Sequence, residues 1–272
     1  MNAIKWAYNT PVLLVMLATL FWGGNAIAGK LAVGHVSPFL LTSLRWLIAV
    51  IVLTPFALTP LKADWHRIRP QLLLMFALGA VGFTVFNNLM YLALTATSAI
   101  NVAIIQSAMP LFVFMLSALF FAVKVNKLQL IGSPITIFGV LVIAFQGRWS
   151  FVLEHSLNYG DLIMLMAVFA YGVYSVFLSK KPNIHWLSTM VVLASAALLS
   201  SIPFTVFEGV SGRLTLPDLT GWSVVLYTAV FASIGSQVFW IRSVELIGAN
   251  TTSVYINLVP LFGSLLAVLL LG

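Results

Sequence analysis

The chain has 272 residues, of which 61% are hydrophobic and only 7% are charged, and its formal net charge is +7. A soluble domain has roughly a quarter of its residues charged. The composition therefore excludes an ordinary globular protein and indicates an integral membrane protein. The absence of cysteine excludes a disulfide framework, a thiolate nucleophile and a cysteine-based metal site.

Nine segments are long and apolar enough to cross a bilayer as helices. A hydrocarbon core about 30 Å thick needs roughly 20 apolar residues at a rise of 1.5 Å per residue. In chain order the segments run from Pro11 to Leu31, Pro38 to Thr59, Gln71 to Thr95, Ala99 to Val123, Leu128 to Gln146, Gly160 to Ser179, Leu187 to Phe207, Leu219 to Val244 and Ala249 to Leu271. Alternating segments typical of barrel strands are not seen, so the sequence predicts an all-α integral membrane fold.

The distribution of charge predicts how the chain is oriented. Cytoplasmic connections carry an excess of Lys and Arg. With the N-terminus in the cytoplasm, that side holds nine of the 13 basic residues, Lys5, Lys62, Arg67, Arg69, Lys124, Lys127, Lys180, Lys181 and Arg242. The other side and the helix ends beside it hold Lys30, Arg45, Arg148 and Arg213. We expect a multi-pass protein of the cell (inner or plasma) membrane with a cytoplasmic N-terminus. Because the basic residues orient the chain, nucleic-acid binding is not expected.

Part of the first half resembles part of the second. At an offset of 150 residues, Pro110-Leu111-Phe112 matches Pro260-Leu261-Phe262, and at an offset of 149, Trp22-Gly23 matches Tyr171-Gly172. If one repeat holds five helices, the odd number makes the second copy enter the membrane from the opposite side. The pattern predicts two inverted five-helix repeats with a site between them near the midplane.

The repeat boundary is expected near residue 150, with residues 1–150 as the first repeat and residues 151–272 as the second. Such a plan has ten helices. The fifth helix ends near Gln146, so its counterpart would end near residue 296, whereas the sequence stops at Gly272. The second repeat therefore lacks its last helix in this chain, or the protein departs from the plan.

Several motifs resemble a known family. In chain order they are Phe21-Trp22-Gly23-Gly24-Asn25, Lys30, Ser37-Pro38, Leu44-Arg45-Trp46, Gly160-Asp161 and Val259-Pro260-Leu261-Phe262. They resemble the two halves of EamA-type transporters of the drug/metabolite transporter superfamily, and the resemblance covers essentially the whole chain. It implies a ten-helix exporter of metabolites from the cytoplasm. A fainter similarity is to the YddG-type amino-acid exporters within that family.

Polar and aromatic residues inside the predicted spans are the candidate substrate-binding residues. Polar groups in hydrocarbon are costly, so they are expected to face the bundle interior or a wet cavity. The candidates are Trp22, Asn25, Asn87, Tyr91, Gln106, Tyr171, Ser175, Ser233, Gln237, Trp240, Tyr255 and Asn257. Helix packing and interhelical hydrogen bonds would explain several of the same positions. A largely aromatic cavity with a few neutral polar groups suits an aromatic or branched amino acid.

Arg45 is a candidate partner for a substrate carboxylate. It lies about seven residues, roughly 10 Å, inside the second predicted helix. Its long side chain could equally extend to the outer interface.

Pro110 and Pro260 are candidate hinges. Each is expected to remove a helical hydrogen bond near the centre of a span and to kink the helix there. The two positions would then be paired bending points for alternating access, or static kinks that shape the cavity.

The residue types that are missing from the span centres bear on the mechanism. No Asp or Glu lies near the centre of a predicted span, which favours downhill export or exchange over proton coupling. The four histidines have no metal-ligand spacing, and no nucleophile elbow or phosphate-binding glycine loop is seen, so we expect no enzyme activity, cofactor or use of ATP.

The predicted function is export of small organic solutes, in the first place neutral or aromatic amino acids, by alternating access. The alternative is efflux of other metabolites or drugs, such as nucleosides, sugars or amphiphiles, with or without proton coupling. A chain with both repeats can form the pathway as a monomer, with the lipid bilayer and a small-molecule substrate as its partners.

Overall fold

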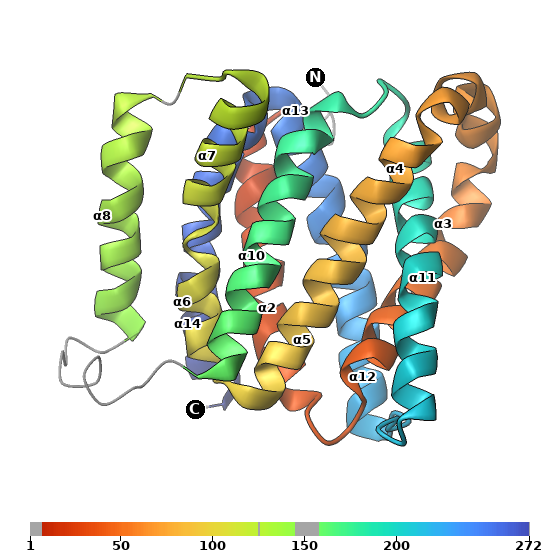
Figure 1. Cartoon of the computed structure of the whole chain (residues 1–272), viewed down its shortest axis with the longest axis vertical. Coiled ribbons are helices and arrows are strands. Elements are labelled where there is room, and N and C mark those ends of the chain that lie inside the picture. The colour runs from red at the N-terminus through yellow and green to blue at the C-terminus, as the bar shows by residue number, and fades with distance from the viewer. Residues whose placement is uncertain (1–6, 125, 145–157, 272) are drawn as a thin grey trace.

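The computed structural model describes residues 7–124, 126–144 and 158–271, and within these ranges every regular element is a helix (Figure 1). The predicted all-α fold is confirmed. Six helical runs within these ranges are long and apolar enough to cross a membrane. Lys5 and Arg148, which entered the charge count, lie outside the described residues.

Each of the nine predicted segments has a helical counterpart. The first half contains α2 (Pro11–Leu31), α3 (Pro38–Ile68), η1 (Arg69–Gln71), α4 (Leu72–Gly79), η2 (Ala80–Val85), α5 (Phe86–Ala96), α6 (Ala99–Gln106), α7 (Met109–Phe121) and α8 (Lys127–Ala144). The second half contains α10 (Tyr159–Phe177), η3 (Leu178–Lys180), α11 (Trp186–Val210), α12 (Leu219–Tyr227), η4 (Thr228–Gly235), α13 (Ser236–Val254), η5 (Tyr255–Asn257) and α14 (Leu258–Leu271). The segments η2 and η4 are π-helical.

Two of the six helical runs are too long for a single crossing. They cover Pro38–Ala96, with 59 residues, and Leu219–Leu266, with 48 residues. At 1.5 Å per residue both are much longer than a hydrocarbon core of about 30 Å, so each must cross twice. The first run reverses direction around η1, between α3 and α4 (Figure 1). The second contains a non-helical Gly248 with φ 79°, a backbone conformation that glycine adopts without strain.

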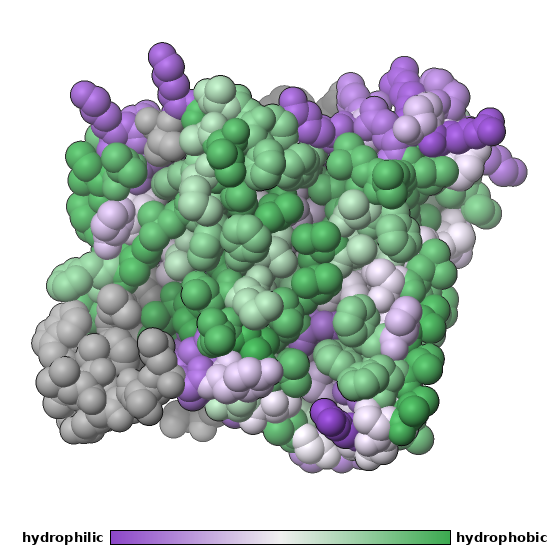
Figure 2. All heavy atoms as spheres, viewed as in Figure 1, coloured by the Kyte–Doolittle hydropathy of each residue, from purple (hydrophilic) through white to green (hydrophobic). Residues whose placement is uncertain are grey.

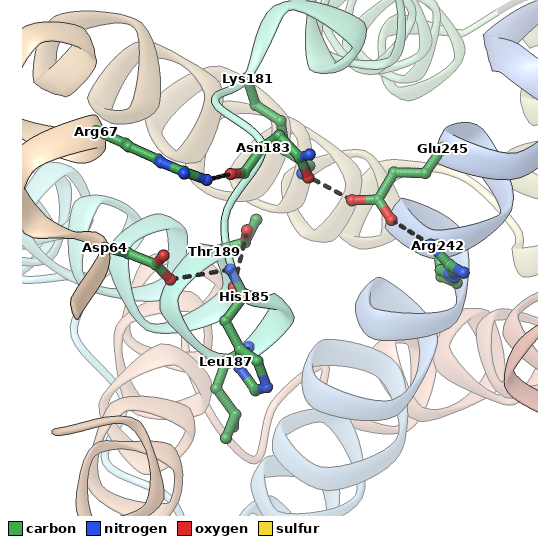
Figure 3. A network of polar contacts seen from close by, with 9 residues as sticks. All are labelled: Asp64, Arg67, Lys181, Asn183, His185, Leu187, Thr189, Arg242 and Glu245. Atoms are coloured by element: carbon green, nitrogen blue, oxygen red, sulfur yellow. Dashed lines mark hydrogen bonds and ion pairs between the residues drawn. The ribbon is translucent and has the colours of Figure 1, made fainter. Parts of the chain in front are cut away.

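Helices α3 and α11 are linked at both ends, because each carries a carboxylate that caps the start of the other. Glu208 of α11 accepts hydrogen bonds from Ser37 Oγ at 2.7 Å and from the Leu40 backbone N–H at 3.0 Å, at the start of α3. Asp64 of α3 accepts from the His185 N–H at 2.9 Å, at the start of α11 (Figure 3). The first N–H groups of a helix have no partner within the helix, and negative charge is favourable there. The two helices are therefore antiparallel and fixed at both ends.

The surface of the bundle is that of a protein surrounded by lipid. Figure 2 shows an apolar belt around the middle, with hydrophilic residues gathered mainly at the end where α3 passes into α4 and where α8 begins. Large apolar side chains such as Phe56 and Leu73 are 70% and 84% exposed. A soluble protein would bury such side chains, whereas the bilayer accepts them.

Pro110 and Pro260 do not interrupt continuous helices, and this part of the prediction is wrong. Helix α6 ends at Gln106 and α7 begins at Met109, so Pro110 lies in the first turn of a new helix. Pro260 likewise lies in the first turn of α14, after η5. The N–H groups of a first turn have no helical acceptor, so a proline there removes no hydrogen bond. The breaks before the two prolines, rather than the prolines themselves, weaken these segments, and a hinge role stays a prediction.

Breaks in regular α-helix recur at the spacing of the predicted repeat. The π-helical segments begin at Ala80 and Thr228, 148 residues apart, and the helices that follow the breaks begin at Met109 and Leu258, 149 residues apart. Helices α2 and α10 run in opposite directions (Figure 1). These observations support two inverted repeats, which remain a prediction.

The reciprocal caps can be tested by removing each charge. We expect Glu208→Gln and Asp64→Asn each to lower the stability of the detergent-solubilised protein by about 2 kcal/mol, because each replaces a charged acceptor of several hydrogen bonds. The measurement is the thermal unfolding midpoint. Lys62→Gln, which changes an exposed charge on α3, is the control. Unchanged midpoints for both cap variants would show that the caps do not hold the pair together.

Candidate substrate-binding site

Arg45 lies inside the bundle and is 1% exposed. Its Nε donates to Ser233 Oγ at 2.6 Å, and its Nη1 donates to Asn87 Oδ1 at 2.8 Å and to the Tyr91 hydroxyl. The guanidinium carbon also lies 5.5 Å from the centroid of the Trp46 ring. The alternative in which Arg45 extends to the outer interface is therefore wrong, because three polar groups of the interior hold its side chain.

All hydrogen-bond acceptors of Arg45 are neutral. Among the described residues, the ion pairs are His35 with Asp218, Lys181 with Glu245 and Arg242 with Glu245, so none involves Arg45. A buried cation is costly unless an opposite charge and hydrogen bonds compensate it. An arginine held this way inside a membrane bundle is a candidate binding site for an anionic group.

The local structure of α5 and η4 presents the acceptors to Arg45. The Asn87 amide Nδ2 donates to the Phe83 carbonyl in the preceding turn, which directs its Oδ1 toward the guanidinium. Ser233 Oγ donates to the Thr228 carbonyl five residues earlier at 2.9 Å, a spacing that the π-helix brings into reach. Both side chains thus donate to backbone carbonyls four or five residues earlier and offer oxygen lone pairs to Arg45.

Tyr91 extends this cluster to the first helix. Its hydroxyl donates to Asn25 Oδ1 at 3.0 Å, and Asn25 is 3% exposed. The cluster, called here the polar layer, consists of Asn25, Arg45, Asn87, Tyr91 and Ser233. It joins α2, α3, α5 and η4, so four segments that are distant in sequence converge on one charge.

Aromatic rings pack beside the polar layer. Trp22, one turn before Asn25, lies 5.2 Å from Trp240 and 5.7 Å from Tyr171, measured between ring centroids. Phe86 lies 4.8 Å from Tyr171. The hydroxyls of Tyr171 and Tyr174 both donate to Gln237 Oε1, at 3.3 and 3.4 Å. This aromatic layer consists of Trp22, Phe86, Tyr171, Tyr174, Gln237 and Trp240.

One donor in the aromatic layer has no partner. The indole N–H of Trp22 donates to the Ala232 carbonyl at 3.2 Å, whereas the buried indole nitrogen of Trp240 has no hydrogen-bond partner among the described residues. Buried polar groups are normally paired, so an unpaired donor between aromatic rings is a further feature of a ligand site.

The two layers contain eight of the twelve candidate binding residues, namely Trp22, Asn25, Asn87, Tyr91, Tyr171, Ser233, Gln237 and Trp240. The other four have different surroundings. Ser175 donates to the Tyr171 carbonyl within α10 at 2.8 Å. Gln106 ends α6, while Tyr255 and Asn257 form part of η5, so these three lie at the breaks before α7 and α14. Their participation in binding stays a prediction.

Sequence reasoning missed several residues at the site. Trp46 stacks on Phe83 with centroids 4.4 Å apart, and its indole nitrogen also has no partner among the described residues. Asn88, next to Asn87 in sequence, is 4% exposed, and neither polar atom of its amide has a hydrogen-bond partner among the described residues. Adjacency to Arg45 and to Asn87 could have pointed to Trp46 and Asn88. Phe83 is one of 20 phenylalanines and carries no such signal.

A cavity of about 120 Å³ reaches the polar layer from one end of the bundle. Its wall includes Tyr91 and Thr95 of α5, Gly29 of α2, and Arg213 and Thr215 in the connection between α11 and α12. Pockets for small molecules have volumes of roughly 300–1,000 Å³. A solute as large as an amino acid would therefore need a wider cavity than the one that this structure shows.

The same end carries an exposed ion pair. His35 Nδ1 lies 2.7 Å from Asp218 Oδ2, and Asp218 also accepts from the Gly221 N–H at 2.8 Å as the cap of α12. The Gly221 N–H and, after it, the His35 imidazole hold the pKa of Asp218 below its ordinary value. The carboxylate thus stays charged and keeps the connections before α3 and α12 together.

The opposite end is closed by a polar network (Figure 3). Glu245 of α13 pairs with Lys181 at 2.7 Å and with Arg242 at 3.1 Å. Arg67 at the end of α3 donates to the Asn183 carbonyl at 3.0 Å. These contacts tie α3, the connection before α11 and α13 to one another, so a path to the layers from this end requires the network to open.

A larger cavity of about 530 Å³ lies beside this network, between α7, α8, α10 and α13. Lys124, Lys180 and Gln129 are among the residues that line it. None of its lining residues belongs to the polar or the aromatic layer, so it is separate from the candidate site.

Comparison with known proteins shows which family has this architecture. The profile of the EamA-like transporter family matches residues 9–145 and residues 158–272. The chain belongs to the EamA-like transporter family. It is 26% identical over 244 residues to the uncharacterized transporter YyaM of Bacillus subtilis strain 168, covering 89% of this chain and 80% of the relative. It is also 26% identical over 271 residues to a probable amino-acid metabolite efflux pump of Salmonella typhimurium strain LT2, covering 95% of this chain and 86% of the relative.

One solved crystal structure shares the fold, with a TM-score of 0.71 at 18% identity, covering 96% of this chain and 88% of that one. Together with the apolar helices, the family shows that the protein is a multi-pass membrane transporter. The resemblance to EamA-type transporters that the motifs indicated is confirmed.

Two adjacent asparagines allow a matched test of the site. We expect Asn87→Asp to cost less stability than Asn88→Asp, because the new carboxylate would lie against Arg45 and compensate its charge, which offsets the lost hydrogen bond to the Phe83 carbonyl. Asn88→Asp should lower stability by about 3 kcal/mol, because it buries a carboxylate where the amide atoms have no hydrogen-bond partner among the described residues. Equal losses in the two variants would contradict an uncompensated charge on Arg45.

Proposed function

We propose that this transporter exports neutral amino acids, aromatic ones among them, and that Arg45 binds the substrate carboxylate. The observation that carries the proposal is a buried guanidinium whose partners are all neutral, next to a layer of aromatic rings. The probable amino-acid metabolite efflux pump among the relatives supports the substrate class at low identity. The YddG-type assignment belongs to the same proposal.

The chemistry of the two layers matches the parts of an amino acid. A carboxylate can accept two parallel hydrogen bonds from a guanidinium, a geometry that lysine does not offer. The faces of Trp22 and Trp240 can attract the ammonium group, and the remaining rings offer apolar area for the side chain. Phosphates or nucleotide sugars would require further buried cations, and Arg45 is the one cation in the two layers.

The layers also bear on energy coupling. They contain no Asp or Glu, so no carboxylate is available there to exchange a proton for the substrate. We therefore propose downhill export or exchange rather than proton-driven efflux. The monomer provides the whole site, because all residues of both layers come from one chain.

Alternating access would connect the layers to each end in turn. We place the lysine-rich end, closed by the Glu245 network, in the cytoplasm, as the positive-inside rule favours. The 120 Å³ cavity near Arg213 would then face the other side. Opening of the network would admit substrate, and opening at the Arg213 end would release it.

The proposal predicts a carboxylate-dependent transport that Arg45 controls. In proteoliposomes without a proton gradient, we expect counterflow of labelled phenylalanine, lowered at least about tenfold in Arg45→Gln, since the loss of one charged hydrogen-bond pair exceeds about 1.4 kcal/mol. Arg45→Lys should retain part of the activity, because it keeps the charge but loses the two-pronged geometry. Lys62→Gln is the control for a changed charge outside the site.

Competition experiments separate the substrate classes. Unlabelled tryptophan should inhibit the counterflow, and tryptophanol, which lacks the carboxylate, should inhibit it far less. Equal inhibition by the two compounds, or full activity of Arg45→Gln, would overturn the role of Arg45 and favour efflux of amphiphiles without a carboxylate. Flux that requires an imposed proton gradient would overturn the uncoupled mechanism.

A further inference from the structure

The hydrogen bonds of Arg45 join the two halves of the chain. Arg45, Asn87 and Tyr91 belong to the first half, whereas Ser233 belongs to η4 in the second half. Beside this bond, the indole N–H of Trp22 donates across the same boundary to the Ala232 carbonyl, next to Ser233 in sequence. Among these contacts between the halves, the bond from Arg45 to Ser233 is the one with a charged donor.

One nitrogen of the guanidinium, Nη2, is free to donate on the edge that also carries Nε. Its Nε bonds to Ser233 and its Nη1 bonds to Asn87 and Tyr91, while Nη2 donates no hydrogen bond among the described residues. A carboxylate that approaches the Nε–Nη2 edge would bind with two parallel hydrogen bonds. To do so, the carboxylate must replace Ser233 as the acceptor of the Nε–H bond, whereas the bonds to Asn87 and Tyr91 can remain.

We propose that the Arg45–Ser233 hydrogen bond is a tie between α3 and η4 that the substrate carboxylate releases, so that the carrier exchanges substrates faster than it moves them in one direction. The inference rests on the proposed function. Without substrate, movement of η4 away from α3 takes the acceptor away from a buried charged donor, which is costly. With substrate bound, the carboxylate compensates the charge, and Ser233 moves freely.

The consequence for transport follows from the carrier cycle. Net export requires the carrier to return without substrate, and the tie slows that step. Exchange avoids it, because the carrier carries substrate in both directions. A substrate on the receiving side should therefore accelerate export.

The chain offers a matched pair of serines for the test. Ser233→Ala removes the tie and leaves Arg45, Asn87 and Tyr91 unchanged. Ser236, one turn later in α13, also donates across the boundary, to the Ala18 carbonyl at 3.2 Å, but does not contact Arg45. Ser236→Ala therefore removes a hydroxyl bond between the halves without affecting the guanidinium.

The experiment measures efflux of labelled phenylalanine from proteoliposomes, with and without unlabelled phenylalanine outside, and separately the binding of phenylalanine to the purified protein. We expect outside phenylalanine to accelerate efflux about tenfold in the wild type, as expected for a hydrogen bond to a charged group. Ser236→Ala should behave in the same way. In Ser233→Ala the acceleration should fall below about threefold through faster one-way efflux, and binding should be as tight as in the wild type or tighter.

The decisive quantity is the ratio of efflux with outside phenylalanine to efflux without it. A ratio near one in a wild type that binds phenylalanine, or the same ratio in Ser233→Ala as in the wild type, would overturn the tie and leave the proposed function standing. Loss of binding together with loss of both fluxes in Ser233→Ala would show a merely structural serine and would also overturn the tie. Failure of the wild type to bind phenylalanine would overturn the proposed function and, with it, this inference.

Discussion

The guanidinium of Arg45 is a charge inside a bundle whose surroundings are hydrocarbon, and no carboxylate of the described residues pairs with it. Its position therefore requires several helices to bring neutral acceptors to one point. The π-helix η4 places Ser233 there, and α5 places Asn87 and Tyr91 there. Tyr91 in turn fixes Asn25 of α2. Removal of any of these groups leaves a buried donor or acceptor without its partner.

Helix α3 can hold this charge because it is fixed at both ends. Glu208 caps its start, and its own Asp64 caps the start of α11. Aligned on their first residues, Pro38 and Trp186, the two helices place Leu193 opposite Arg45 in the repeat, and Leu193 is fully buried. Within the proposed pair of repeats, the frame is thus nearly symmetrical, whereas the charge is present on one side only. A directional site for a molecule with one anionic end fits such an arrangement.

The two ends of the bundle differ in how they are closed. At one end the Glu245 network joins α3, α13 and the connection before α11 through charges (Figure 3). At the other end a small cavity extends to Tyr91, and the exposed His35–Asp218 pair ties the neighbouring connections. Ion pairs near the ends of a membrane protein can exchange partners with water, so they can open at lower cost than contacts in the hydrocarbon region.

The sequence by itself determined the all-helical membrane fold, the positions of the spans and the family, because apolar length and short motifs are local properties. Spacing along a helix also identified most of the polar and aromatic side chains of both layers. Only the tertiary structure decided where Arg45 points, since a long side chain can reach either the interface or the interior. The stacking of Trp46 on Phe83, the unpaired amide of Asn88 and the breaks before Pro110 and Pro260 likewise depend on neighbouring helices, whose contacts no local pattern specifies.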